Sequence, residues 1–270
     1  MLNKDTQLCI SLSARPSNIG TRFHNYLYQK LDLDFIYKAF STTDIEAAIK
    51  GVRALGIRGC SVSMPFKESC IPFIDKLTDS AKAIDSVNTI VNDNGFLTAY
   101  NTDFLAIRQL ITEHLTDPQQ TVVVQGAGGM AKAVVAAFHD AGFQQLTVIA
   151  RNTQTGQALA EKYGYAYQSP EQCPTADIIV NVTPIGMSGG AESDTLAFAQ
   201  PLIDAATTVF DVVAFPAQTP LIKKAHALGK AVISGDRVIA LQALEQFALY
   251  TGERPSDALM QEASLFSRQQ

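Results

Sequence analysis

The feature that most constrains the fold is the segment TVVVQGAGGMAKAVVAAFHDAGF at residues 121–143. An apolar run suited to a buried strand leads into a glycine-rich turn, and a stretch with helical apolar spacing follows. A second apolar run, LTVIAR, occupies residues 146–151. A strand, a glycine turn, a helix and a second strand in this order are typical of a dinucleotide-binding unit.

Three glycines give the turn its predicted function. Gly126, Gly128 and Gly129 permit backbone angles and close approaches that a Cβ atom would block. The N-terminus of the following helix presents free N–H groups and a partial positive charge, which suit a pyrophosphate. We therefore expect the cofactor to bind along Gly126, Ala127, Gly128, Gly129, Met130 and Ala131. A purely structural glycine turn is the alternative.

The end of the second strand indicates which nucleotide binds. NAD-selecting units usually carry an acidic residue there, which grips the ribose 2′-OH. This chain has Arg151 followed by Asn152, and the first acidic residue of the loop is Glu161. A guanidinium group binds a phosphate through two hydrogen bonds. We predict NADP as the cofactor, with Arg151 and Asn152 among its ligands; a surface arginine at a strand end is the alternative.

The same alternation of strand-like and helix-like segments runs along the chain and favours an α/β fold with parallel sheets. The DNG sequence at 93–95 adds a predicted hairpin turn. Apolar patterning predicts strands at 8–13, 34–41, 60–64, 84–93, 175–183, 207–213 and 230–234, and helices at 20–31, 43–55 and 104–115.

The composition excludes several classes of partner. Hydrophobic residues make up 47% and charged residues 17%, which fits a compact soluble protein. The net charge of −5 and the lack of a basic run argue against nucleic acid, and no apolar segment is long enough for a membrane span. The four cysteines and four histidines are scattered without metal-ligand spacing, so we expect no metal, reduced thiols and a cytoplasmic location.

Six blocks resemble the motifs of the shikimate dehydrogenase family and occur in the family's order over nearly the whole chain. They are SVSMPFK (61–67), SVNTI (86–90), YNTD (100–103), GAGGMAKA (126–133), NVTPIGM (181–187) and ALQALEQFALYTG (240–252). The resemblance implies two lobes. A substrate-binding α/β lobe would comprise 1–103 with a helical return at 236–270, and a doubly wound Rossmann lobe would comprise 104–235.

The resemblance also implies a reaction: NADP-linked interconversion of shikimate and 3-dehydroshikimate, in aromatic amino acid and chorismate biosynthesis. The family's lysine and aspartate at the reacting hydroxyl fall on Lys67 and Asp103. Oxidation of an alcohol releases a proton, and desolvation in a cleft lowers the pKa of a lysine so that it exchanges protons nearer pH 7. The alternatives are that Lys67 is an ordinary solvated lysine and that Asp103 only caps a helix. The remaining positions are Ser61, Ser63, Asn88, Gln242 and Asn18 for substrate, and Thr183 and Arg237 for the cofactor.

The match breaks at NIGTRFHN (18–25), where the family usually reads S-x-S-P-x-x-H-N and its two serines hold the substrate carboxylate. Asn18 and Gly20 stand at the serine positions, and glycine supplies no side-chain donor. We expect a substitute among the neighbouring polar residues, Ser17, Asn18, Thr21, Arg15 and Arg22.

Three further departures concern the cleft and the cofactor. Ala214 stands where the family commonly has Tyr, and Arg237 and Val238 stand where it commonly has Gly and Met near the nicotinamide. Gly156 replaces a second basic residue in the nucleotide loop, which weakens the NADP prediction without reversing it.

These observations predict a divergent shikimate dehydrogenase-like enzyme that is slow on shikimate or prefers a related acid. One alternative is a dehydrogenase of quinate or of another cyclic hydroxy acid. Another is an NADP(H)-binding regulator with little catalysis, although such a protein would not need Lys67 and Asp103. We expect a small-molecule substrate and a monomer or homodimer.

Overall fold

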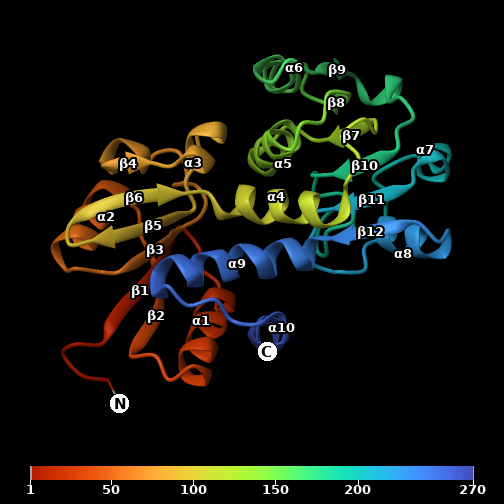
Figure 1. Cartoon of the computed structure of the whole chain (residues 1–270). Helices are drawn as coiled ribbons and strands as arrows, with labels where there is room; N and C mark the ends of the chain where they lie inside the picture. Colours follow the sequence, from red (N-terminus) through yellow and green to blue (C-terminus); the bar gives the residue numbers. More distant parts are fainter. Residues whose placement is uncertain (1, 270) are drawn as a thin grey trace. The chain divides into compact units, whose positions relative to one another are not determined.

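The computed structural model describes residues 2–269, which divide into two compact units (Figure 1). Unit 1 runs up to Thr102 and resumes at Ala240, and unit 2 is Asp103–Ile239. Each unit is built on its own six-stranded sheet. Within the described residues, no helix combines the length and the apolar character that a membrane crossing requires.

The sheet of unit 1 is parallel except for one strand. Its order is β2 (Phe35–Ser41), β1 (Gln7–Ser13), β3 (Gly59–Val62), β5 (Thr89–Asp93), β6 (Phe96–Tyr100) and β4 (Lys76–Leu77). β5 runs antiparallel to both β3 and β6. Asn94 and Gly95 turn the β5–β6 hairpin with φ angles of 53° and 92°, which Asn and Gly adopt more readily than other residues. This confirms the hairpin predicted at 93–95.

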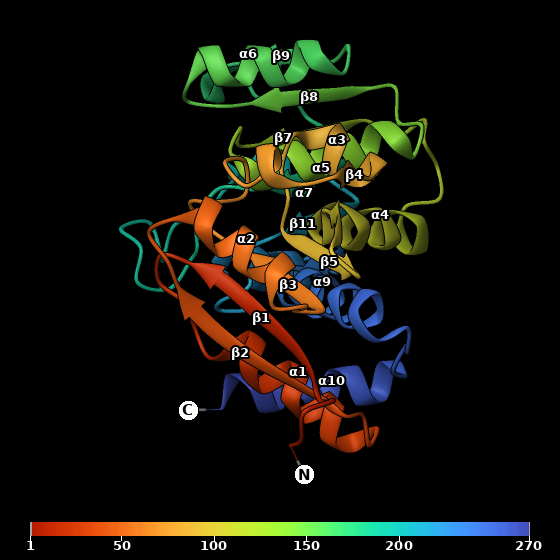
Figure 2. The same ribbon diagram turned by 90° about the vertical axis from the view of Figure 1, so that its left-hand side faces the viewer.

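The two helices predicted from apolar spacing in unit 1, at 20–31 and 43–55, form within two residues of those bounds. The helices of this unit are α1 (Ile19–Lys30), α2 (Ile45–Ala54), α3 (Asp79–Ile84), the unit 1 part of α9 (Gly235–Thr251) and α10 (Asp257–Arg268), with a short 3₁₀ turn η1 at Ile71–Phe73. Asp44 caps α2, because its Oδ1 accepts a hydrogen bond from the Ala47 N–H at 2.9 Å. α1 packs against both β2 and α10 (Figure 2).

The prediction of one strand over 84–93 is wrong in its first half. α3 extends to Ile84, and Asp85 ends it in the left-handed conformation with φ 51°. The chain joins the sheet only at Thr89. The apolar residues between them, such as Val87, are buried in the core without forming a strand, so burial alone produced the misleading pattern.

A glycine lets the C-terminal helix α9 lie against the sheet of unit 1. A Cβ atom on Gly59 would stand 2.3 Å from Cδ1 of Tyr250, so no other residue fits at the start of β3 without displacing that ring. The core of this unit gathers apolar side chains from the sheet and α2, among them Ile10, Ile49, Val62, Ile90 and Leu97.

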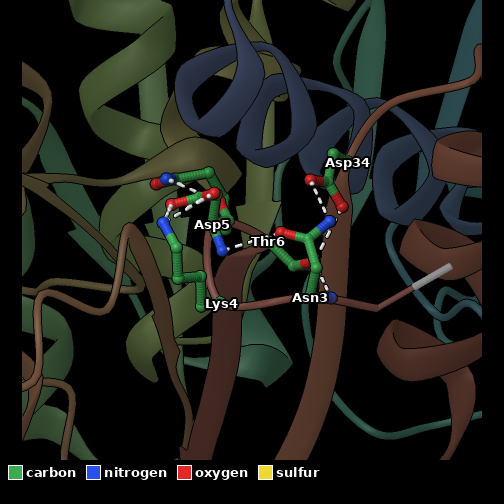
Figure 3. A network of polar contacts seen from close by, with 6 residues as sticks. Asn3, Lys4, Asp5, Thr6 and Asp34 are labelled. Carbon is green, nitrogen blue, oxygen red and sulfur yellow. Dashed lines mark hydrogen bonds and ion pairs between the residues drawn. The ribbon is translucent and has the colours of Figure 1, made fainter.

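The chain before β1 is fastened to the turn before β2 by a small polar network (Figure 3). The Asn3 amide and the Thr6 hydroxyl both donate to the Asp34 carboxylate, at 3.2 Å and 2.7 Å. Lys4 pairs with the neighbouring Asp5 at 2.8 Å. These contacts are exposed, so they position the ends of the two strands more than they stabilise the fold.

The sheet of unit 2 is wholly parallel and doubly wound. Its order is β12 (Ala231–Ser234), β11 (Thr208–Asp211), β10 (Ile178–Asn181), β7 (Val122–Gln125), β8 (Leu146–Ile149) and β9 (Ala166–Gln168). The chain starts at the centre with β7, moves outward through β8 and β9, and returns to β10 on the other side. This is the Rossmann strand order, and ligands bind such sheets at the carboxyl ends of the strands where the order reverses.

Helices flank the strands of unit 2. They are α4 (Thr102–His114), α5 (Gly129–Asp140), α6 (Thr153–Lys162), α7 (Gln200–Ala205), α8 (Pro220–Ala227) and the first turn of α9, with a 3₁₀ turn η2 at Pro170–Gln172. α5 packs on β7, α6 on β8 and β9, and α8 on β11 and β12 (Figure 1). The core includes Val123, Ile149, Ile179, Val209 and Leu221. The strands predicted near 178, 208 and 231 are confirmed.

Candidate functional site

A cavity of about 660 Å³ opens at the reversal point of the unit 2 sheet. Its wall includes Gln125 and Gly126 at the end of β7, Ile149 and Arg151 at the end of β8, and Thr183 after β10. The site that the Rossmann order predicts is therefore a real hollow, large enough for part of a dinucleotide.

The glycine turn at this cavity has the features that a pyrophosphate needs. Gly126 has a φ of 130°, and a Cβ on it would lie 2.7 Å from Cγ2 of Val182. A Cβ on Gly128 or Gly129 would meet no atom within 4 Å, so the space beside them is open. Gly128 precedes α5 without a side-chain cap, which leaves the first N–H groups of that helix for a ligand. The residues present therefore fit a dinucleotide. Of the two predicted residues that follow in α5, Met130 is half-buried and Ala131 is fully buried.

Arg151 stands at the cavity with an acidic partner that the local sequence does not reveal. Its Nη2 atom lies 2.6 Å from Oε1 of Glu192, a residue that also lines the cavity. The hydrogen bond to Glu192 raises the pKa of the Arg151 guanidinium. Asn152 caps α6, because its Oδ1 accepts from the Thr155 N–H at 3.1 Å. Glu192 was missed because it lies 41 residues further along the chain.

Packing explains why no second basic residue follows in this loop. Gly156 is buried, and a Cβ on it would lie 2.5 Å from Cε2 of Tyr167. The Tyr167 hydroxyl donates to the carbonyl of Ala150 at 3.0 Å. The aromatic ring of β9 therefore occupies the space that a side chain at position 156 would need.

A buried polar network holds Thr183 at the cavity wall. Oδ1 of Asn181 accepts from the Thr183 N–H at 3.0 Å and from its hydroxyl at 2.6 Å. The Asn181 amide donates to Asp211 at 3.0 Å, and the Thr219 hydroxyl donates to the same carboxylate at 2.7 Å. Burial raises the pKa of the Asp211 carboxyl, although these hydrogen bonds oppose part of the shift.

Arg237 forms an ion pair with a residue of α4. Its Nη2 atom lies 3.3 Å from Oε2 of Glu113 on α4, and it does not line the cavity among the described residues. Six of the other predicted cofactor residues line this one cavity, namely Gly126, Ala127, Gly128, Arg151, Asn152 and Thr183. Gly129, Met130 and Ala131 follow in α5 and are not among its described lining residues.

In unit 1, main-chain bonds join the segment that carries Lys67 to the segment that carries Asn88. The half-buried Lys67 follows β3, and its carbonyl accepts from the Val87 N–H at 2.8 Å. Oδ1 of Asn88 accepts from the N–H of Thr102 at 2.8 Å and from its hydroxyl at 3.1 Å. The Asn88 amide nitrogen is buried and has no hydrogen-bond partner among the described residues, which leaves a donor for a ligand.

Gln246 is a polar residue of this region that motif reading missed. It is 4% exposed, and its amide donates to Thr89 Oγ1 at 3.0 Å, to Ser61 Oγ at 3.3 Å and to the Asn88 carbonyl at 3.3 Å. It lies one helical turn after the predicted Gln242 on α9, a spacing that places both on one side of the helix. This spacing from Gln242 was the feature of the sequence that could have identified Gln246.

The other predicted substrate residues occupy varied environments. Ser61 lies half-buried on β3, Ser63 is exposed just after it, and Gln242 is half-buried on α9. Asp103 is 8% exposed near the start of α4 and is the first residue of unit 2.

The altered segment 18–25 separates into structural and exposed parts. Asn25 donates to the Tyr37 carbonyl at 2.8 Å and accepts from the Tyr37 N–H at 2.9 Å. The ring of His24 stacks on that of Tyr37 with centroids 4.4 Å apart, and burial lowers the pKa of His24 to about 3. Asn18 is exposed, with its carbonyl accepting from the Arg22 N–H at 2.9 Å.

Of the two arginines expected as substitutes for the serines, Arg22 makes its contacts with the C-terminal end of the chain. Arg22 lies over the Phe266 ring at 5.0 Å and donates to the carbonyl of Gln269, both at the C-terminal helix α10. Arg15 is exposed in the loop after β1. No group of three or more His, Cys, Asp or Glu within residues 2–269 is arranged to hold a metal ion.

Comparisons with known proteins agree on a family. Residues 17–90 match the shikimate dehydrogenase substrate binding domain, and residues 108–184 match the shikimate / quinate 5-dehydrogenase domain. The chain is 63% identical to a shikimate dehydrogenase-like protein of Haemophilus influenzae over 99% of both chains.

Two solved structures extend this agreement. Shikimate 5-dehydrogenase of Thermus thermophilus, solved with NADP(H) and shikimate, is 26% identical with a TM-score of 0.86 and covers 97% of this chain and 99% of its own. Quinate dehydrogenase of Corynebacterium glutamicum, solved with NAD, is 28% identical with a TM-score of 0.88 over 96% and 99%. The chain belongs to the shikimate dehydrogenase family.

Proposed function

We propose that this protein is an NADP-dependent oxidoreductase that interconverts shikimate, or a closely related cyclic hydroxy acid, and the corresponding ketone. The observation that carries the proposal is the cavity at the reversal point of the unit 2 sheet, with its open glycine turn and Arg151. The chain also keeps Lys67 and Asp103 at the family's motif positions. The Thermus relative solved with NADP(H) and shikimate supports this choice of cofactor and substrate.

Lys67 and Asp103 handle the proton of the reacting hydroxyl. Bound NADP would supply the acceptor for the hydride of the carbinol carbon, and bound NADPH would supply the hydride for the reverse direction. As the alcohol is oxidised, its O–H bond breaks and the Lys67 amine takes the proton; in reduction the ammonium gives it back. By its motif position Asp103 acts on the same hydroxyl, and the spare amide donor of Asn88 binds another oxygen of the ring.

Arg151, Thr183 and the first turn of α5 hold the cofactor. The α5 N-terminus binds the pyrophosphate through main-chain N–H groups, and Arg151 meets the 2′-phosphate. Asn181 and Asp211 position Thr183 without touching the ligand themselves.

The loss of the serine clamp predicts a protein that is slow on shikimate or prefers a related acid, and it favours quinate or another cyclic hydroxy acid as a second candidate. Gly20 offers no hydroxyl, and α10 engages Arg22. Arg15 is therefore the arginine that remains to bind the substrate carboxylate.

Steady-state assays test the proposal. The purified protein is offered NADP or NAD with shikimate, quinate and other cyclic hydroxy acids, and Lys67→Ala is compared with Lys82→Ala, an exposed lysine on α3. We expect turnover with NADP, loss of turnover in Lys67→Ala and wild-type rates in Lys82→Ala. Absence of turnover on shikimate with both cofactors would reject the leading substrate, and NADPH binding without turnover on any acid would favour the regulator.

A further inference from the structure

We propose that Glu192 is a specificity-determining residue for the cofactor, because it competes with the 2′-phosphate of NADP for Arg151. On this view the Arg151–Glu192 pair sets the ratio of NADP affinity to NAD affinity. The inference rests on the proposed function, since it assumes that the unit 2 cavity binds a dinucleotide.

The geometry places the two charges together where the adenosine ribose belongs. Nη2 of Arg151 lies 2.6 Å from Oε1 of Glu192. Both residues line the cavity, and among its described lining residues Arg151 carries the only positive charge and Glu192 the only negative one. This pair therefore carries the charge of the cavity's described lining residues.

The main chain holds Glu192 in place. Its carbonyl accepts from the Gly186 N–H at 2.9 Å and from the Thr195 N–H at 3.2 Å. Gly186 has a φ of 85° and lies against Thr219, whose hydroxyl is bonded to the buried Asp211. The carboxylate thus stands on a fixed part of the loop after β10.

Two residues with opposite effects on the choice between NAD and NADP lie together at this point. An acidic residue at the ribose favours NAD, and an arginine favours NADP. Here the arginine comes from the loop after β8 and the carboxylate from the loop after β10, so both signals reach the same ligand. Because Gly156 is packed under Tyr167, its position offers no second cation to offset the carboxylate.

Simple electrostatics gives the direction of the effect. A guanidinium has five N–H donors, so Arg151 can bind a phosphate while part of it stays paired with Glu192. The carboxylate repels the phosphate and occupies one edge of the guanidinium. NAD lacks the 2′-phosphate, so its affinity does not depend on breaking this pair.

Equilibrium titration of NADPH and NADH into the full chain, followed by nucleotide fluorescence, tests the inference without needing turnover. Because a partly exposed ion pair has a modest effect, we expect Glu192→Gln to tighten NADPH binding by about three- to tenfold. NADH binding should not tighten, because NADH carries no 2′-phosphate for the carboxylate to repel. In the Arg151→Ala background the same substitution should bring a smaller gain for NADPH, because only the direct repulsion between carboxylate and phosphate is then relieved.

Asp194→Asn is the matched control, because Asp194 is exposed on the same loop, loses the same charge and does not line the cavity. Equal tightening by Glu192→Gln and Asp194→Asn, an equal gain for NADH, or no gain for NADPH would each overturn the inference. If the wild type binds neither nucleotide while remaining folded, the proposed function fails instead.

Discussion

The nucleotide end of unit 2 and the segment before α1 in unit 1 differ in how they present binding groups. At the glycine turn, recognition depends on main-chain N–H groups and on backbone angles that Gly126 allows. At residues 18–25, the family's recognition depends on two hydroxyl groups, and Asn18 and Gly20 have replaced them. Main-chain recognition survives as long as the turn survives, whereas side-chain recognition is lost with a single substitution.

The same division runs through the altered segment itself. His24 and Asn25 keep the family pattern, and the structure shows them stacked on and bonded to Tyr37 in β2. The retained residues of this motif stabilise the unit, whereas at the replaced serine positions Asn18 is exposed and a Cβ on Gly20 would lie 3.6 Å from the Tyr37 ring. Retention of a motif residue is therefore a guide to substrate only after its structural contacts are known.

The largest expected effect is on the side-chain chemistry of unit 1. Because general acid–base catalysis contributes about 10²- to 10⁴-fold, Lys67→Ala should lower kcat by that factor. NADPH affinity, measured by titration, should remain within about twofold of wild type, since this change is equivalent to only a few tenths of a kcal/mol. A variant with wild-type kcat would remove Lys67 from the mechanism.

Substitution of Gly126 tests how far the glycine turn depends on its backbone conformation. Alanine there must adopt a φ of 130° and meets Val182 at 2.7 Å, so Gly126→Ala should lower the free energy of unfolding by about 1–3 kcal/mol. Urea unfolding measures the loss. Gly128→Ala is the matched control, because its added methyl group meets no atom within 4 Å; it should weaken NADPH binding and leave stability unchanged. Equal losses of stability in both variants would contradict this account.

A pH-dependent effect on stability should appear in acid. Burial lowers the pKa of His24 to about 3, so between about pH 6.5 and 3 the unfolded chain binds a proton that the folded chain does not. Stability is therefore lost as the pH falls through this window, by up to about 1.4 kcal/mol per pH unit. His24→Phe should flatten this slope, as urea midpoints at several pH values would show. His226→Phe, at an exposed histidine on α8, should keep the wild-type slope; identical slopes in all three proteins would rule out His24 as the cause.

The smallest expected effect sharpens what the altered segment now binds. If Arg15 replaces the serine clamp, Arg15→Ala should raise KM for the preferred acid by about three- to tenfold with little change in kcat. Arg22→Ala should lower the thermal midpoint through its lost contacts with Phe266 and Gln269 and leave KM near wild type. A larger rise of KM in Arg22→Ala would reverse the assignment.

Local pattern sufficed for the parts of the fold in which one segment decides its own structure. The β7–turn–α5 unit, the Asp44 cap and the Asn94–Gly95 hairpin were all predictable from residues a few positions apart. Strands of two or three residues, such as β4 and β9, have no periodicity to detect. The segment at 84–88 was misread because buried apolar residues occur there without a strand.

At the candidate site, the contacts that could not be predicted are those between residues far apart in the sequence. Glu192 reaches Arg151 across 41 residues from a turn-rich loop, and no local pattern marks it. Gln246 was within reach, since it follows Gln242 by one helical turn. The packing of Tyr167 over Gly156 explains an absent side chain, and it becomes visible only when the strand β9 is in place.

The contact between Asn25 and Tyr37 also bears on self-association. β2 is an outer strand of its sheet, and an outer strand with free N–H and C=O groups can recruit a strand from another chain. The Asn25 amide satisfies both main-chain groups of Tyr37 on the side away from β1, much as an added strand would. The Asn25 side chain, which belongs to a substrate motif, thus also blocks strand pairing at the Tyr37 position of this sheet edge.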